Sequence, residues 1–267
     1  MRISCLIPTR DRARMVQRAI ASVLAQRRPC DEIVVVDDGS VDGTAELLAG
    51  RFPQIRLLRL AGVGPGRARN AGVAVATGEV IMFLDSDDEW TPDHVQRLAA
   101  IFEAGGEVGY GTARTIDLVG GGEFFIPDRG AGANGDCFEA LLRWCFLVPS
   151  AMAVSRTAFA RVGGFALNDL GEDWGFFLQL AQHYPFGFAG PQPITIRYLH
   201  EGSQCRLHSR QTVVDAVSAL HRLNWEEERR EAASSRFNQL ISWINHKETP
   251  WTTVHEWYLS LKRDNLV

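Results

Sequence analysis

Strand-like and helix-like segments alternate four times in the first hundred residues, and this pattern constrains the fold more than any other feature. Four short apolar or β-branched runs fit buried strands, at residues 3–8, 32–36, 55–60 and 80–84. Apolar side chains recur at helical spacing after each run, at residues 15–24, 42–48, 66–76 and 92–104. Asp11 is expected to cap the first helix. Such alternation is typical of a parallel α/β sheet.

The pattern changes after residue 104. Further strands are expected at 108–116, 150–155 and 195–199, with helices at 136–144, 157–162 and 172–183. The glycine-rich stretch 120–135 indicates a loop or a short hairpin. Beyond residue 205 the pattern is almost wholly helical. We therefore expect an α/β domain over residues 1–204 and a helical C-terminal extension over 205–267.

Charge and cysteine content exclude several classes of protein. The net charge is −4, with 28 Lys+Arg against 32 Asp+Glu, which disfavours a protein that binds nucleic acid. The five cysteines are odd in number and lack CxxC spacing, as is usual in a reduced cytoplasm. The first strand pattern starts at Ile3, so no targeting segment is expected. No run of about 18 apolar residues predicts a transmembrane helix. A cytoplasmic protein is expected, with peripheral membrane contact left open.

Two strings of acidic residues stand at strand ends. Asp37 and Asp38 close the second strand, where ligands bind in open α/β sheets, and a carboxylate there can accept the N3–H of uracil. The plain alternative is a strand-to-helix turn capped by Asp42. Asp85, Asp87 and Asp88 close the fourth strand.

Mutual repulsion among the three carboxylates of this second string would be relieved by Mg²⁺ or Mn²⁺, which prefer oxygen ligands. If the backbone stays extended, Asp85 and Asp87 face the same side. A metal held there would neutralise a diphosphate leaving group. The plain alternative is a polar loop with a helix cap.

Three weaker signals follow. The segment 62–72 is not GxGxxG, because Arg67 occupies the last required position, but its arginine-bearing helix can approach phosphate oxygens. Glu172 and Asp173 open a helix and can supply a general base, although acids are common at helix starts anyway. His200 at a strand end is a weak candidate metal ligand.

In order and spacing, these strings resemble the family 2 inverting glycosyltransferases of GT-A fold, over about residues 3–200. The matching strings are Ile7-Pro8-Thr9-Arg10, Asp37-Asp38-Gly39-Ser40, Ala68-Arg69-Asn70-Ala71-Gly72, Asp85-Ser86-Asp87, and Val162-Gly163-Gly164-Phe165 followed by Glu172-Asp173. The resemblance implies a mostly parallel central sheet flanked by helices. It also implies transfer of a sugar from a nucleotide-diphosphate sugar, with UDP favoured, to a saccharide, lipid-linked or other hydroxyl acceptor, with inversion.

The resemblance assigns roles residue by residue. Asp173 is the expected base, with Glu172 beside it, and Asp85, Asp87 and Asp88 are candidate ligands of Mn²⁺ or Mg²⁺; His200 is added to these ligands only from its position at a strand end. The nucleotide would be bound by Pro8, Thr9, Arg10, Asp37, Asp38, Gly39, Arg69, Asp85 and Ser86.

Two departures from the family pattern leave questions open. Gly175 stands where the family often has another acid, and residues 205–267 match no family pattern, so acceptor recognition or homo-oligomer formation is expected there. A sugar-phosphate nucleotidyltransferase is a weaker alternative, because the segment after the first strand lacks glycine. A non-catalytic nucleotide-sugar-binding protein is the third interpretation.

Overall fold

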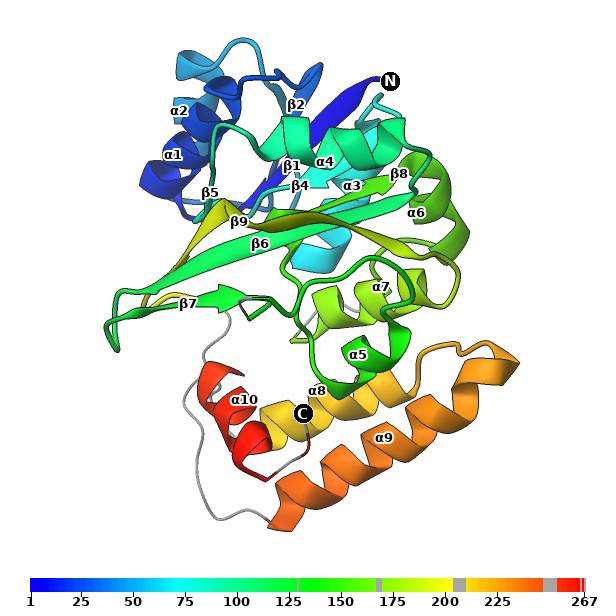
Figure 1. Ribbon diagram of the computed structural model, residues 1–267. Coiled ribbons are helices and arrows are strands. Elements are labelled where there is room, and N and C mark those ends of the chain that lie inside the picture. The colour runs from blue at the N-terminus through cyan, green and yellow to red at the C-terminus, as the bar shows by residue number, and fades with distance from the viewer. Residues whose placement is uncertain (129, 167–169, 204–209, 247–253, 265, 267) are drawn as a thin grey trace.

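The computed structural model describes residues 1–267 except 129, 167–169, 204–209, 247–253, 265 and 267. Helices cover both faces of one central sheet, and three C-terminal helices lie together below it (Figure 1). The strands are β1 (Ile3–Thr9), β2 (Glu32–Asp37), β3 (Arg56–Arg59), β4 (Val80–Phe83), β5 (Glu89–Trp90), β6 (Val108–Asp117), β7 (Glu123–Ile126), β8 (Met152–Ser155) and β9 (Phe186–Leu199).

The helices follow in chain order between and after these strands. They are α1 (Ala13–Leu24), α2 (Thr44–Arg51), α3 (Pro65–Val75), α4 (His94–Glu103), α5 (Phe138–Arg143), α6 (Arg156–Val162), α7 (Glu172–Ala181), α8 (Arg210–His221), α9 (Glu227–His246) and α10 (Val254–Arg263), with one 3₁₀ turn at Pro149–Ala151.

The sheet has the order β3-β2-β1-β4-β8-β6-β9-β5, and β7 pairs with β6. The first four strands are parallel, which confirms the interpretation of the strand–helix alternation. Strand β8 runs antiparallel to both of its neighbours, so the sheet is mixed beyond β4. Because β1, β2 and β4 are parallel, their carboxyl ends meet at one edge of the sheet, and the loops that carry the acidic strings start there.

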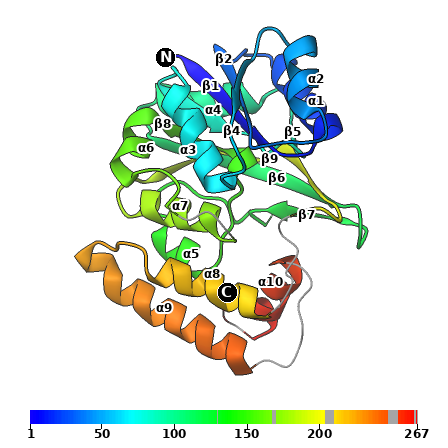
Figure 2. The same cartoon turned by 180° about the vertical axis from the view of Figure 1, so that it is seen from behind.

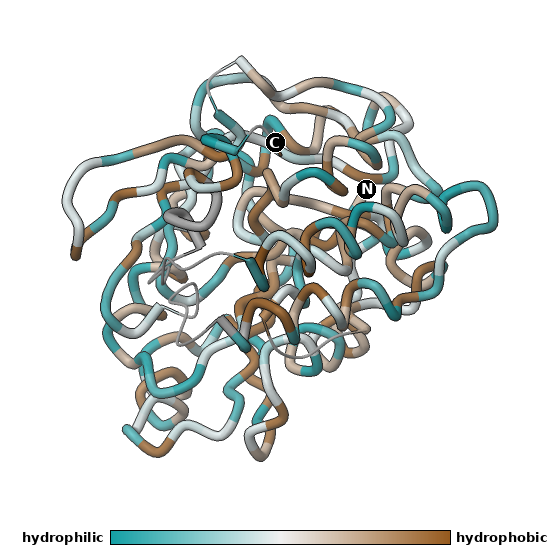
Figure 3. The backbone as a smooth tube through the Cα atoms, turned by 90° about the horizontal axis from the view of Figure 1, so that it is seen from below, coloured by the Kyte–Doolittle hydropathy of each residue, from teal (hydrophilic) through white to brown (hydrophobic). Residues whose placement is uncertain are grey.

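Each face of the sheet has its own apolar core. On one face, side chains of α1, α2 and α4 pack against β1, β2 and β4. On the other face, α3, α5, α6 and α7 pack together with α8 and α9. Figure 2 shows the C-terminal helices lying beneath α5 and α7. Seen from below, many outer loops are hydrophilic and apolar stretches run through the interior (Figure 3). The C-terminal helices therefore share a core with the sheet, while the expected boundary at 204–205 lies outside the described residues.

Local details differ from the sequence expectations in three places. Asp11 does not cap α1; it adopts a left-handed conformation with φ 51°, and Arg12 is the N-cap residue without a side-chain cap. The Asp11 carboxylate instead accepts the N–H of Val41 at 2.7 Å. The two-residue strand β5 was not expected, and β9 begins nine residues earlier than predicted, at Phe186. The glycine-rich stretch does contain a hairpin strand, β7.

Within the described residues, none of the helices is long and apolar enough to cross a membrane.

Candidate active site

A cavity of about 1310 Å³ opens at the carboxyl ends of the parallel strands. Its walls come from the loops after β1, β2 and β4, the starts of α3 and α7, the end of β9, and α8. They include Pro8, Thr9, Arg10, Arg12, Asp38, Arg69, Asp85, Ser86, Asp87, Asp88, Glu172, Asp173, His200, Asp215, Ala216, Ala219 and Arg222. Of the site residues expected from the sequence, Asp37 and Gly39 do not line the cavity.

Asp38 lies in the cavity wall with both carboxylate oxygens already engaged. Its Oδ1 accepts the N–H of Val63 at 2.7 Å, and its Oδ2 accepts the N–H of Gly64 at 2.8 Å. These bonds hold the loop before α3 against the end of β2. Each carboxylate oxygen has further acceptor capacity, so Asp38 can still accept a donor from a ligand.

The neighbours of Asp38 support this turn from behind. Asp37 is fully buried, and its Oδ1 accepts the N–H of Ser40 at 3.2 Å. Gly39 has φ 78°, and a Cβ there would lie 2.9 Å from the backbone nitrogen of Gly62. Both residues therefore shape the turn that positions Asp38, and neither faces the cavity.

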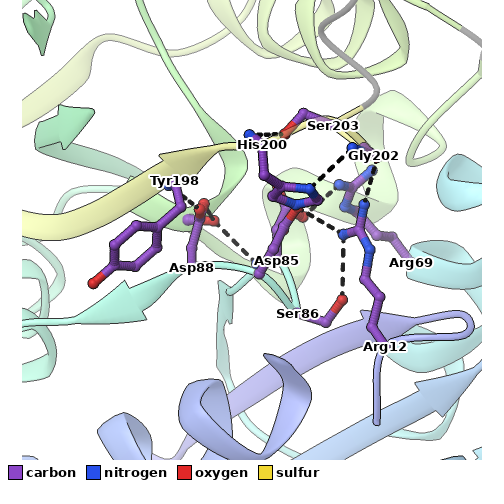
Figure 4. A network of polar contacts seen from close by, with 11 residues as sticks. Arg12, Arg69, Asp85, Ser86, Asp88, Tyr198, His200, Gly202 and Ser203 are labelled. Atoms are coloured by element: carbon purple, nitrogen blue, oxygen red, sulfur yellow. Dashed lines mark hydrogen bonds and ion pairs between the residues drawn. The ribbon is translucent and has the colours of Figure 1, made fainter. Parts of the chain in front are cut away.

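The acidic loop after β4 is a tight turn and not an extended segment. The N–H of Asp88 donates to the carbonyl oxygen of Asp85 at 3.0 Å and closes the turn. As a result Asp85 and Asp87 do not share one set of partners, contrary to the expectation from an extended DxD. Asp85 meets Arg69 (Figure 4), whereas Asp87 meets Arg12 and His200.

Asp87 forms the ion pairs on the Arg12 side of this loop. Its Oδ2 lies 2.8 Å from Nη1 of Arg12 and 3.0 Å from Nε2 of His200. Burial raises the pKa of Asp87, but the hydrogen bond from His200 and the charge of Arg12 outweigh it, so the pKa is lowered.

Asp88 is turned the opposite way, into the protein. It is 3% exposed and accepts hydrogen bonds from Oγ of Ser150 at 2.6 Å and from the N–H of Tyr198 at 3.2 Å. Burial, followed by the charges of Asp87 and Asp85, raises the pKa of Asp88 well above its ordinary value. Ser150 also accepts the N–H of Asp85 at 3.0 Å, so this one buried hydroxyl fixes both ends of the turn.

Arg69 joins the acidic loop to the start of α7. Its Nη2 lies 2.7 Å from Oδ1 of Asp85, and its Nη1 lies 2.9 Å from Oε1 of Glu172. The side chain is 5% exposed. Both terminal nitrogens are thus committed to carboxylates, which makes Arg69 a bridge between the two halves of the site as well as part of the cavity wall.

Glu172 and Asp173 follow Gly171, which is the left-handed N-cap of α7 with φ 91°. Burial and then the adjacent charge of Asp173 raise the pKa of Glu172 to about 7, although Arg69 opposes the shift. Burial also raises the pKa of Asp173, against a hydrogen bond from the N–H of Trp174 and the charge of Arg69. A carboxylate with a raised pKa is a better proton acceptor near neutral pH.

Comparisons with known proteins identify the family. The model of glycosyl transferase family 2 matches residues 4–162. An uncharacterized glycosyltransferase of Nostoc sp. (strain PCC 7120) is 32% identical over 254 residues, which is 91% of this chain and 75% of the relative. The chain belongs to glycosyltransferase family 2. This membership makes it an enzyme of the glycosyltransferase class and argues against the nucleotidyltransferase and non-catalytic interpretations.

Other similarities of this family 2 chain are more local or more distant. The succinoglycan biosynthesis protein ExoO of Rhizobium meliloti is 42% identical over 106 residues, which is 39% of this chain and 30% of that protein. The crystal structure of S. aureus TarS with UDP-GlcNAc aligns with a TM-score of 0.71 over 89% of this chain and 72% of that chain, at 19% identity. A mannosyltransferase of Pyrobaculum calidifontis, solved with GDP-Man and Mn²⁺, aligns with a TM-score of 0.64 over 91% of this chain and 71% of that chain, at 18% identity. These structures establish the GT-A fold of the chain.

The donor atoms beside the acidic loop fit a divalent cation. Among the described residues no three His, Cys, Asp or Glu side chains gather as a preformed metal site. Asp87 and His200 form a pair within 3.0 Å. Mg²⁺ is commonly held by one or two protein ligands together with substrate phosphates, and Mn²⁺ accepts oxygen and imidazole ligands. A two-ligand site completed by a diphosphate is therefore consistent with this pair.

Sequence reasoning missed three parts of the site. Arg12 and Ser150 carried no motif, and only their contacts with the acidic loop reveal them. The third part is α8, whose Asp215, Ala216, Ala219 and Arg222 line the cavity. A helical-periodicity argument would place these four residues on one face of a helix, but nothing in the sequence says which cavity that face meets.

Proposed function

We propose that this enzyme transfers a sugar from a nucleotide-diphosphate sugar, with UDP the favoured nucleotide, to an acceptor hydroxyl with inversion and with the help of Mn²⁺ or Mg²⁺. The observation that carries the proposal is the shared cavity. It brings the acidic loop after β4 and the carboxylates of buried Glu172 and half-buried Asp173 into one space, with Arg69 between the loop and Glu172. Its volume exceeds the roughly 1,000 Å³ upper range of a single small-molecule pocket, which leaves room for donor and acceptor together.

The nucleotide would lie at the end of the cavity formed by Pro8, Thr9, Arg10 and Asp38. Asp38 would accept the N3–H of uracil with the acceptor capacity that its two backbone bonds leave free. The fold neighbours include a structure with UDP-GlcNAc and one with GDP-Man, so the fold itself is compatible with either base. Asp38 fits the N3–H of uracil, which remains the favoured base of the proposal, although the N1–H of guanine is a donor that the same carboxylate can accept.

The diphosphate would lie against the acidic loop. Asp87 and His200 are the residues that would hold the cation, and Asp85 would face the nucleotide beside Ser86. When bound, the cation supplies charge neutralisation of the leaving diphosphate. Asp88 contributes by shape, because its bonds to Ser150 and Tyr198 fix the turn that presents Asp87.

Asp173 would take the proton from the acceptor hydroxyl. Its raised pKa suits that task, and its position at the start of α7 is separated from the acidic loop by Arg69. A base on one side of the sugar and a leaving group on the other is the arrangement that inversion requires. Glu172, held by Arg69, positions the helix start.

The acceptor would approach past α8. Gly171 lies beside this helix, since a Cβ on Gly171 would be 3.9 Å from Cβ of Ala216. The cavity face of α8 carries Ala216 and Ala219 between Asp215 and Arg222. Small side chains flanked by polar ones suit a hydroxyl-bearing molecule. In this proposal residues 1–204 bind the donor, and the helices after 205 complete the acceptor side.

The test is Asp173→Asn, with Asp136→Asn on the exposed surface as the matched control. General-base action contributes about 10²–10⁴-fold, so Asp173→Asn should lower the rate of sugar transfer by a factor in that range. UDP affinity, measured by calorimetry with Mn²⁺, should stay within about threefold of wild type because Asp173 binds no part of the nucleotide.

If Asp173→Asn transferred sugar at the wild-type rate, the assignment of Asp173 as the base would be wrong. Equal UDP affinity of the wild type with Mn²⁺ and with EDTA would remove the metal role.

A further inference from the structure

Arg12 lies beside the two residues that would hold the cation. Its Nη1 is 2.8 Å from Oδ2 of Asp87, the same oxygen that lies 3.0 Å from Nε2 of His200. Arg12 and Asp87 are 23% and 13% exposed, so solvent only partly screens this ion pair. The guanidinium of Arg12 therefore neutralises the Asp87 carboxylate that a divalent cation would need.

The loop after β1 is built to hold Arg12 in this place. Asp11 precedes it with φ 51°, a conformation that costs free energy in residues other than glycine. Two bonds to the loop after β2 maintain it: the N–H of Asp11 donates to Oγ of Ser40 at 2.9 Å, and the Asp11 carboxylate accepts the N–H of Val41 at 2.7 Å. A strained backbone that is held from two sides next to a ligand cavity indicates a constraint on where the next side chain points.

Arg12 also reaches the segment that carries His200. Its Nη2 lies 3.4 Å from the carbonyl oxygen of Gly202, and its Nη1 lies 3.5 Å from Oγ of Ser86. One side chain thus contacts the loop after β4 and the end of β9 together. It therefore bridges the two segments that carry the candidate metal ligands Asp87 and His200.

We propose that Arg12 is a built-in counter-ion that occupies the cation position beside Asp87, so that Mn²⁺ or Mg²⁺ binds tightly only together with a nucleotide diphosphate. A divalent ion arriving alone would have to displace a cation from the same carboxylate oxygen. A diphosphate changes this balance, because its oxygens can accept the guanidinium as a charge-assisted partner and add ligands to the metal. Arg12 then moves from carboxylate to phosphate. This inference rests on the proposed metal-dependent function and specifies that the metal and the nucleotide diphosphate bind cooperatively.

The test measures metal affinity without any turnover. Free Mn²⁺ is titrated by electron paramagnetic resonance into wild type, Arg12→Gln and Arg12→Lys, with and without UDP. Without UDP, Arg12→Gln should bind Mn²⁺ at least tenfold more tightly than wild type, because the competing charge is gone. Arg12→Lys keeps that charge and should remain within about threefold of wild type.

The matched control is Arg18→Gln. Arg18 lies on the following helix, α1, with its Nη1 3.5 Å from Oε1 of Glu89. The substitution Arg18→Gln therefore removes one positive charge near the same acidic segment without changing a partner of Asp87. Its nucleotide-free Mn²⁺ affinity should equal that of wild type. A melting curve for each variant separates loss of fold from loss of charge, and Arg12→Ala replaces Arg12→Gln if the latter unfolds.

The outcomes separate this inference from the proposed function. Unchanged or weaker Mn²⁺ binding by folded Arg12→Gln without UDP would overturn the role of Arg12, even if UDP binding by wild type depends on the metal. If Arg18→Gln also bound Mn²⁺ tenfold more tightly without UDP, the effect would come from overall charge near the site, and the specific role of Arg12 would be overturned as well. If neither wild type nor variant binds Mn²⁺ in the presence of UDP, the metal role itself fails, and the inference fails with it.

Discussion

At alkaline pH the buried carboxylate of Glu172 should make the wild-type enzyme less stable than the variant Glu172→Gln. The ordinary pKa of 4.5 is raised to about 7 in the folded protein, mainly by burial and by the charge of Asp173. The folded protein therefore holds this proton up to about pH 7, whereas the unfolded chain releases it near pH 4.5. Wild type consequently loses stability as the pH rises through that window.

The size of this stability loss follows from the difference between the pKa of Glu172 in the unfolded and in the folded protein. Between 4.5 and about 7, at about 1.4 kcal/mol for each pH unit, ionised Glu172 costs about 3 kcal/mol above pH 7. Glutamine is similar in shape to the protonated acid and can still accept from Nη1 of Arg69. Glu172→Gln should thus raise the free energy of unfolding by about 3 kcal/mol at pH 8 and by less than about 1 kcal/mol at pH 5.

Urea unfolding followed by tryptophan fluorescence at both pH values measures the difference directly. Glu139→Gln, on the exposed side of α5, is the control for the chemical change itself, and its stability should match wild type at both pH values. Effects common to all carboxylates cancel because each variant is compared with wild type at the same pH. Equal stability of Glu172→Gln and wild type at pH 8, or a loss there, would refute the reasoning.

Three further outcomes are expected. Ser150→Ala removes the hydroxyl that fixes the acidic loop, so it should cost about 1–3 kcal/mol of stability by urea unfolding and raise the donor KM. Gly72→Ala would place a Cβ 2.4 Å from Cδ1 of Leu6 and should cost about 1–3 kcal/mol, whereas Gly50→Ala, also helical but with nothing within 4 Å, should not destabilise. Ala219→Trp on α8 should abolish transfer to acceptor while hydrolysis of the donor in water, followed by UDP release, continues; loss of both activities would contradict the acceptor role of α8.

The sequence was a good guide wherever the deciding physics is local. The period of apolar residues specified the four helices of residues 1–104 and every strand there except the two-residue β5, because burying one helix face or a whole strand requires that spacing. The acidic strings were correctly expected at one edge of the sheet, since parallel strands end together. Family membership confirmed the fold and the enzyme class that these strings suggested.

Only the tertiary structure decided which side chains meet. A tight turn separates Asp85 from Asp87, and Arg69 bonds both to Asp85 and to Glu172, which lies 103 residues further along the chain than Arg69. Arg12 reaches Asp87, and α8 reaches the cavity, with no signal in the local sequence. Periodicity and turn chemistry act over a few residues, but charge pairing and pKa shifts depend on burial and on partners brought together by packing. The chain thus encodes its elements locally, while its site exists only after the two halves of the fold have packed.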